Sequence, residues 1–109
     1  MRKFIVIYRA PASSFEKVKD MTPAERKKGM EPWIAWMKKC GAGLVDGGSP
    51  LGNGMNVTPA GTSGSNSDIA GYSILQADDM KKAAAMLKDH PHLKWGAGCS
   101  IEVHECMPM

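Results

Sequence analysis

The stretch Lys88-Asp89-His90-Pro91-His92-Leu93-Lys94-Trp95-Gly96-Ala97-Gly98-Cys99-Ser100-Ile101-Glu102-Val103-His104-Glu105 decides the fold. Because a proline disfavours helical dihedral angles at the residue before it, the helix that leads into this stretch is expected to end at His90. A Gly-Ala-Gly loop follows, and a final strand is expected over 99–107. Side chains alternate along a strand, so Ile101 and Val103 share an apolar face. The opposite face is polar and carries Ser100, Glu102, His104 and Cys106.

Three segments nearer the N-terminus also have the composition of strands. Phe4–Tyr8 is a continuous run of β-branched and aromatic residues, which is typical of a central strand covered on both faces. Leu44–Asp46 predicts a short second strand, and Ile69–Leu75 predicts a third.

A glycine-rich segment, 47–68, lies between two of these predicted strands. A loop of that length without secondary structure is uncommon in a compact domain. We therefore expect a hairpin arm around Met55–Thr58, with a mobile tip over 61–67.

The first long helix is expected to begin at Thr22-Pro23-Ala24-Glu25, where Thr22 can cap the helix and Glu25 can complete a capping box. Pro32 lacks an N–H and crowds the preceding turn, so a kink or break is expected near 29–31. Trp33 is expected to pack in the core. The apolar stripe of this helix consists of Met30, Trp33, Ile34, Met37 and Cys40.

A second helix is expected to begin at Asp78 or Asp79, either of which can cap it. A short helical turn is also expected over 15–21. The apolar stripe of the second helix consists of Met80, Ala83, Ala84 and Leu87.

The order strand, helix, strand, strand, helix, strand indicates an α+β protein with a ferredoxin-like βαββαβ arrangement. Its sheet is expected to be antiparallel, with both helices on one face. The 109 residues are expected to form a single domain, 1–109.

Composition and charge argue against several function classes. The formal net charge is only +3, and the lysines form no continuous basic stripe, so we expect no nucleic-acid partner. No apolar run approaches the roughly 20 residues that span a bilayer, and the start of the chain does not have the pattern of a signal peptide. Three cysteines without a Cys-x-x-Cys spacing predict reduced thiols in a cytoplasmic protein without a metal site.

His90 is the first candidate catalytic residue. Its imidazole can donate or accept a proton near neutral pH, and Asp46 or Asp89 could assist it. The alternative is structural, since a histidine at a helix C-terminus stabilises the helix dipole by about 0.3–1 kcal/mol. His92 is expected to be an exposed loop residue.

Other polar and aromatic side chains are candidates for substrate binding. Glu102 and His104 share one strand face, where the carboxylate could orient the imidazole or raise its pKa. Such a pair is also common at solvated or interface positions. Ser49, Tyr72 and Trp95 are expected to shape a pocket beside the glycine-rich segment.

These segments together resemble the YCII-related family of small α+β proteins, which includes YciI-like and DGPF-type dimeric α+β barrels. The resemblance covers most of the chain and is carried by Phe4–Tyr8, Gly41–Gly48, Gly71-Tyr72 and His90–Val103. It implies a homodimer in which two sheets pack face to face, so that the polar face of the last strand lines a dimer cavity. It also implies a cleft between the sheet, the first helix and the glycine-rich loop.

The chain departs from the family at one position. Some members carry a histidine on the first helix, proposed to work with an aspartate, and that histidine aligns near Met30 here. Neither Met30 nor its neighbours Gly29 and Glu31 can act as an imidazole, so that pair cannot be carried over intact and any chemistry would need another base. The resemblance still implies a cofactor-free homodimer with a cleft for an unknown small molecule. If it is an enzyme, His90 would move a proton and Asp46 would orient or share it. The alternatives are a non-catalytic ligand-binding or protein-interaction module and, by analogy of fold alone, a cofactor-free oxygenase.

Overall fold

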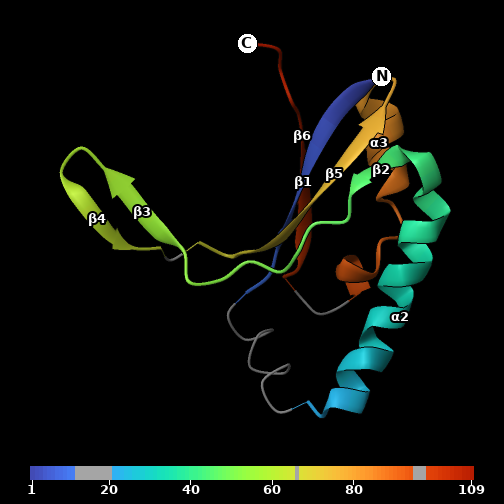
Figure 1. Ribbon diagram of the computed structural model, residues 1–109, viewed down its shortest axis with the longest axis horizontal. Helices are drawn as coiled ribbons and strands as arrows, with labels where there is room; N and C mark the ends of the chain where they lie inside the picture. Colours follow the sequence, from blue (N-terminus) through green and yellow to red (C-terminus); the bar gives the residue numbers. More distant parts are fainter. Residues whose placement is uncertain (12–20, 66, 95–97) are drawn as a thin grey trace.

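The computed structural model describes residues 1–11, 21–65, 67–94 and 98–109 (Figure 1). Its main sheet has four antiparallel strands in the order β2-β5-β1-β6. These strands are β1 (Arg2–Arg9), β2 (Leu44–Asp46), β5 (Ile69–Ala77) and β6 (Ser100–Glu105). The chain is thus a small α+β protein with an antiparallel sheet.

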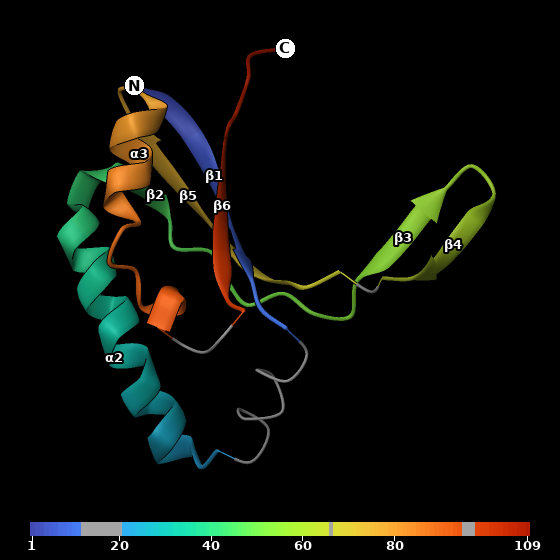
Figure 2. The same ribbon diagram turned by 180° about the vertical axis from the view of Figure 1, so that it is seen from behind.

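Two α-helices lie on the same side of this sheet, as both views show (Figures 1 and 2). They are α2 (Pro23–Cys40) and α3 (Met80–Met86). Two short 3₁₀ turns, η1 (Gly41–Gly43) and η2 (Pro91–Lys94), follow the helices along the chain. Among the described residues, no helix combines the length and the apolar character needed to cross a membrane.

Strand β1 runs through the middle of the sheet, between β5 and β6. Phe4, Val6 and Tyr8 point toward the helices and are buried, because side chains alternate along a strand. Ile5 and Ile7 point to the opposite side and are only half-buried. The prediction of a central strand is confirmed, but in the single chain only one of its faces is covered by helices.

Helix α2 begins where the sequence predicts. The Thr22 hydroxyl accepts a hydrogen bond from the Glu25 backbone N–H at 3.2 Å, and Pro23 occupies the first turn. The predicted break near 29–31 is wrong, since α2 continues through Pro32 to Cys40. Pro32 removes the hydrogen bond to the carbonyl of Lys28, but Lys28 is exposed, so water can satisfy that carbonyl.

Helix α3 is capped by Asp79, whose side chain accepts from the Lys82 backbone N–H at 2.8 Å. Asp78 instead pairs with the Lys82 ammonium at 2.9 Å. The helix ends at Met86, before the predicted end at His90, because the chain tightens into turns. One of these turns is closed by the His90 N–H, which donates to the Leu87 carbonyl at 3.1 Å.

The glycine-rich segment forms a separate hairpin of β3 (Met55–Thr58) and β4 (Gly61–Gly64). The strand around Met55–Thr58 is therefore confirmed. Gly61–Gly64, which was expected to belong to a mobile tip, instead forms the second strand of the hairpin and pairs with β3 residue by residue. The helical turn predicted over 15–21 falls almost entirely outside the described residues.

The loop after β2 lies directly against β5. Gly48 has a φ of +75°, and its N–H donates to the Asp46 carboxylate at 2.8 Å. A β-carbon at position 48 would lie 1.7 Å from the carbonyl oxygen of Tyr72. Only glycine combines this backbone conformation with so close an approach to a neighbouring strand.

We predict that Gly48→Ala lowers the free energy of unfolding by more than about 1 kcal/mol, because it adds both strain and a backbone clash. Gly52→Ala is the matched control in the same loop, since a β-carbon there meets nothing within 4 Å. Urea unfolding followed by circular dichroism measures both. Equal effects of the two substitutions would contradict the structural role of Gly48.

Candidate ligand-binding groove

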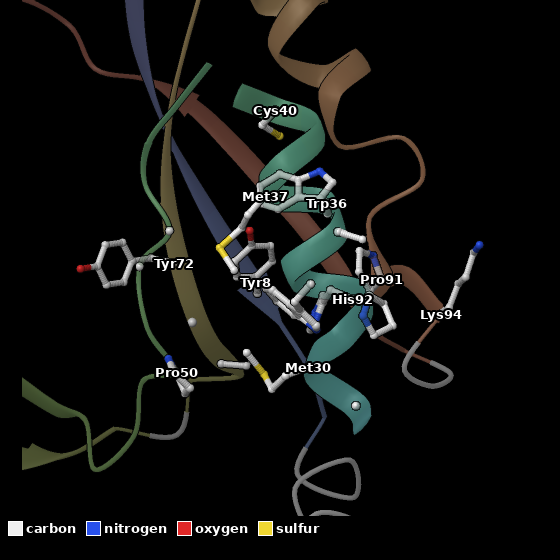
Figure 3. Close-up of a pocket in the computed structure, with 18 of the residues that line it drawn as sticks. Tyr8, Met30, Trp36, Met37, Cys40, Pro50, Tyr72, Pro91, His92 and Lys94 are labelled. Carbon is white, nitrogen blue, oxygen red and sulfur yellow. The ribbon is translucent and has the colours of Figure 1, made fainter. Parts of the chain in front are cut away.

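A cavity of about 1210 Å³ follows α2 on both sides, and the part between α2, the loop at 47–50 and β5 forms a groove (Figure 3). Its position matches the cleft expected between the sheet, the first helix and the glycine-rich loop. The walls are mostly apolar and include Met30, Trp33, Trp36, Met37, Pro50 and Met86.

One face of α2 supplies the helical wall. Arg26, Met30, Trp33, Met37 and Cys40 are spaced three or four residues apart, so they stand on neighbouring turns of the same face. In Figure 3, Met30, Trp36 and Met37 point from α2 toward the space that Tyr8 borders from the sheet.

The opposite wall is the loop at 47–50, which is held to β5 by main-chain hydrogen bonds. Tyr72 N–H donates to the Ser49 carbonyl at 3.3 Å, and Leu51 N–H donates to the Ala70 carbonyl at 2.9 Å. The close approach of Gly48 to Tyr72 adds to this attachment. The loop wall is therefore part of the rigid sheet edge.

Five rings form a cluster beside the groove: Tyr8, Trp33, Trp36, His90 and His92. All of them except His90 also line the groove. The His90 ring centroid lies 4.8 Å from that of Tyr8, 4.4 Å from Trp33 and 4.3 Å from Trp36. Edge-to-face and tilted ring pairs of this kind contribute about 0.5–1.5 kcal/mol each beyond the area that they bury. The indole N–H of Trp36 is satisfied as well, since it donates to the Met86 carbonyl at 2.9 Å.

His90 is 0% exposed inside this cluster. Its Nδ1 accepts a hydrogen bond from the His92 backbone N–H at 2.9 Å, so the proton of the neutral ring resides on Nε2. Nε2 has no hydrogen-bond partner among the described residues. Burial, and secondly the proximity of His92, lower the pKa of His90 to about 4. The helix-dipole interpretation requires the charged imidazole, which this burial disfavours.

His92 is also buried, so its prediction as an exposed loop residue is wrong. Its Nε2 lies 2.8 Å from the Arg9 carbonyl, to which it must donate, because a carbonyl oxygen only accepts. His92 therefore ties η2 to the end of β1. Pro91 makes this possible by turning the chain back toward the sheet after α3.

A buried hydrogen-bond chain connects the ring cluster to the loop wall. The Ser73 hydroxyl donates to the Gly47 carbonyl at 2.9 Å. The Tyr8 hydroxyl, 2.7 Å from the Ser73 oxygen, must then donate to it. Burial raises the pKa of Tyr8 to about 12, an effect partly offset by the hydrogen bond with Ser73. Tyr8 is thus a neutral donor at physiological pH.

The structure does not bring the predicted pair His90 and Asp46 together. A register shift in β2 places Asp46 opposite Ile74, and paired residues of adjacent strands point to the same side of a sheet. Asp46 accepts a hydrogen bond there from the Tyr72 hydroxyl at 3.5 Å. That side is the face without helices, whereas His90 packs on Tyr8 beneath the helices. Asp89, the alternative partner, borders the groove.

The predicted binding residues fall on two different surfaces. Ser49 and Tyr72 border the groove, but the Tyr72 ring points away from Tyr8 and Trp36 (Figure 3). Glu102 and His104 lie on the face of the sheet without helices, with His104 Nε2 3.7 Å from a Glu102 carboxylate oxygen. Trp95 lies outside the described residues.

The groove residues that sequence reasoning missed are mainly on α2. Met30 and Met37 belong to an apolar stripe at helical spacing, which on its own predicts core packing. The signal that distinguishes them is a cation on the same helix face, since Arg26 is spaced four residues before Met30 and also borders the groove. Within the described ranges, no three His, Cys, Asp or Glu side chains gather as a metal site.

Comparisons with known proteins give a likeness of fold. No protein-family model matches the chain, and no curated protein matches it. Among solved structures, the chain is similar to 5-chloro-2-hydroxyhydroquinone dehydrochlorinase (TftG) from Burkholderia phenoliruptrix AC1100 in complex with 2,5-dihydroxybenzoquinone. The two share 16% sequence identity with a TM-score of 0.54, over 92% of this chain and 90% of the other. At this identity, the likeness shows that the α+β architecture of the two chains is similar.

Proposed function

We propose that this chain is a YCII-like homodimeric protein that binds a small molecule in the groove between α2 and the loop at 47–50. The observation that carries the proposal is the groove itself. It is large enough for a small ligand, its walls are mostly apolar, and few polar groups border it. TftG, which has a similar fold, was solved with a small quinone bound, which supports a ligand of one or two rings.

The charge at the groove narrows the class of ligand. Arg26 lies on the same face of α2 as Met30 and places a positive charge at the edge of the groove. Unlike charges attract more strongly beside low-dielectric apolar walls than in bulk water, whereas a second positive charge would be repelled. The ligand that fits best has a flat apolar body and one anionic group.

We expect 2-naphthoate to quench the tryptophan fluorescence and to bind at least about 5-fold more tightly than the neutral 2-naphthamide, because only the carboxylate is attracted by Arg26. Met30→Asp should weaken naphthoate binding by about 10-fold, since it places a negative charge in the groove wall.

Ile34→Asp is the matched control for the groove. Ile34 is on the same helix and is 45% exposed, close to the 49% of Met30, but it does not line the groove. It should bind naphthoate like the wild type. If naphthoate and naphthamide bind with equal affinity, the ligand does not need an anionic group. If Met30→Asp and Ile34→Asp lower the affinity for naphthoate equally, the ligand binds outside the groove.

The homodimer is proposed from the sheet face without helices. At the centre of this face, Ile5 lies beside Ile74, and Ile7 lies beside Tyr72. On β6, the same face is polar, where Glu102 accepts from Arg9 at 3.1 Å. An apolar centre with a polar flank is the composition of an interface. The strand order β2-β5-β1-β6 supports the ferredoxin-like arrangement, in which two such sheets could face each other as a dimeric α+β barrel.

Sedimentation equilibrium at micromolar concentration is expected to give twice the chain mass of 11.7 kDa. Ile7→Asp should convert the protein to a monomer, because it places an unpaired charge at the centre of the interface. Ile34→Asp, on α2, should remain a dimer. A monomeric wild type would refute the homodimer without affecting the groove.

Catalysis by proton transfer, with His90 as the base and Asp46 as its partner, is the second candidate function. It is favoured by the position of His90 against Tyr8 and Trp33 of the groove lining and by its Nε2, which has no partner among the described residues. The pKa of about 4 keeps the ring neutral at pH 7 but makes it a weak base, which argues against this candidate. Catalysis would require His90 to become accessible from the groove and a different partner, or a movement of Asp46 from the opposite face. Binding without turnover requires neither change, so we favour the binding function.

Because the folded-state pKa of His90 lies below its unfolded value of about 6.5, folding favours the neutral ring. The stabilisation is complete above pH 6.5 and is lost as the pH falls toward 4. We predict a loss of about 2–3 kcal/mol in the free energy of unfolding from this group over that range. His90→Gln should lose this part of the pH dependence, whereas His104→Gln should retain it. If His90 titrates near 6.5 by NMR, it is accessible to solvent, and the catalytic candidate gains support.

A further inference from the structure

The hairpin β3–β4 extends from the body of the protein on the side away from α2 (Figures 1 and 2). Every residue of its two strands is exposed. The radius of gyration, 15.2 Å, exceeds the roughly 13 Å of a compact chain of this length, so the hairpin is not folded back on its own body. An isolated two-stranded hairpin is at best marginally stable in water, which indicates that a further contact supports it.

The two faces of the hairpin differ in character. Met55 and Val57 alternate along β3 and therefore share a face, on which they oppose Gly64 and Thr62 of β4. They are 63% and 78% exposed. The other face carries Asn56. The hairpin is thus amphipathic, and its apolar face has no cover within the described part of the chain.

The sequence around the hairpin lacks the charged residues that usually keep exposed strands from pairing with other chains. Residues 47–67 contain no charged side chain, although charged residues make up 23% of the whole sequence. Exposed edge strands in soluble proteins commonly carry charged residues, lysine above all, which prevent pairing with other chains. An uncharged hairpin with an apolar face has the properties of a buried contact surface.

We propose that the apolar face of this hairpin, formed by Met55 and Val57, packs against a second copy of the chain, so that each protomer holds its partner with its own hairpin. This inference rests on the proposed homodimer. The hairpin extends on the same side as the sheet face without helices, which is the face proposed to receive the second sheet (Figure 1). In a two-fold dimer the symmetry repeats every contact, so a hairpin that reaches the second protomer would be matched by the partner's hairpin on the first.

The base of the hairpin allows a clean deletion. Ser65 N–H donates to the Gly54 carbonyl at 3.0 Å, so the two residues are already in strand register. Replacing 55–64 with Asn-Gly would close this pair with a two-residue turn. The deletion removes no residue of the buried core, so the thermal midpoint and circular dichroism of the body should be retained.

The test measures the dimer dissociation constant by sedimentation velocity over a dilution series. The deletion and Val57→Asp should each raise it by at least about 10-fold, because both remove apolar contact with the partner. Asn56→Asp, which adds the same charge to the opposite face of the hairpin, should change it by less than about 2-fold.

The possible outcomes separate this inference from the proposed function. If the wild type is a dimer that Ile7→Asp dissociates, but the deletion and Val57→Asp leave the dissociation constant unchanged, the hairpin inference is wrong and the homodimer stands. Equal effects of Val57→Asp and Asn56→Asp would also overturn it, since the apolar face would then have no special role. A monomeric wild type would overturn both.

Discussion

The groove depends on the contacts of Tyr8, which join the sheet to α2, to the turn after α3 and to the loop at 47–50. Its ring packs on Trp33 of α2 and on the two histidines beyond α3. Its hydroxyl continues through Ser73 to the carbonyl of Gly47. One side chain of the central strand therefore fixes the helix, the turn after α3 and the loop wall relative to the sheet. The packing of the rings stabilises this arrangement. The two hydrogen bonds fix the orientation of the Tyr8 hydroxyl, because burying a hydroxyl without a partner costs free energy.

The alternation of side chains along the strands divides the protein into two surfaces with different chemistry. Side chains on one face of the sheet reach the helices and the groove, and those on the other face form an apolar centre with ion pairs at its edge. The register shift in β2 determines the surface to which Asp46 belongs. This separation explains why residues that look like one site in the sequence, such as His90 and Asp46, lie on opposite sides of the sheet.

Local patterns predicted the elements well, because capping and alternation depend on neighbouring residues. The Thr22 cap, the central strand, the alternating last strand and the strand at Met55–Thr58 all follow from such patterns. The candidate site was predicted less completely. The burial of His90 and His92 results from contacts with Tyr8 and α2, which are distant in sequence. Met30 and Met37 have the spacing of core residues, and only the position of the loop at 47–50 shows that they border a groove.

Because Gly48 lies so close to β5, the two walls of the groove differ in the substitutions that they can tolerate. The loop wall cannot accept a larger residue at position 48 without displacing a strand, so its shape is almost independent of the ligand. Met30, on the opposite wall, is a flexible side chain that is 49% exposed on the helix surface and can be exchanged at little cost to the fold. Divergence in ligand preference among proteins built this way would therefore accumulate on the helix, while the loop retains its form.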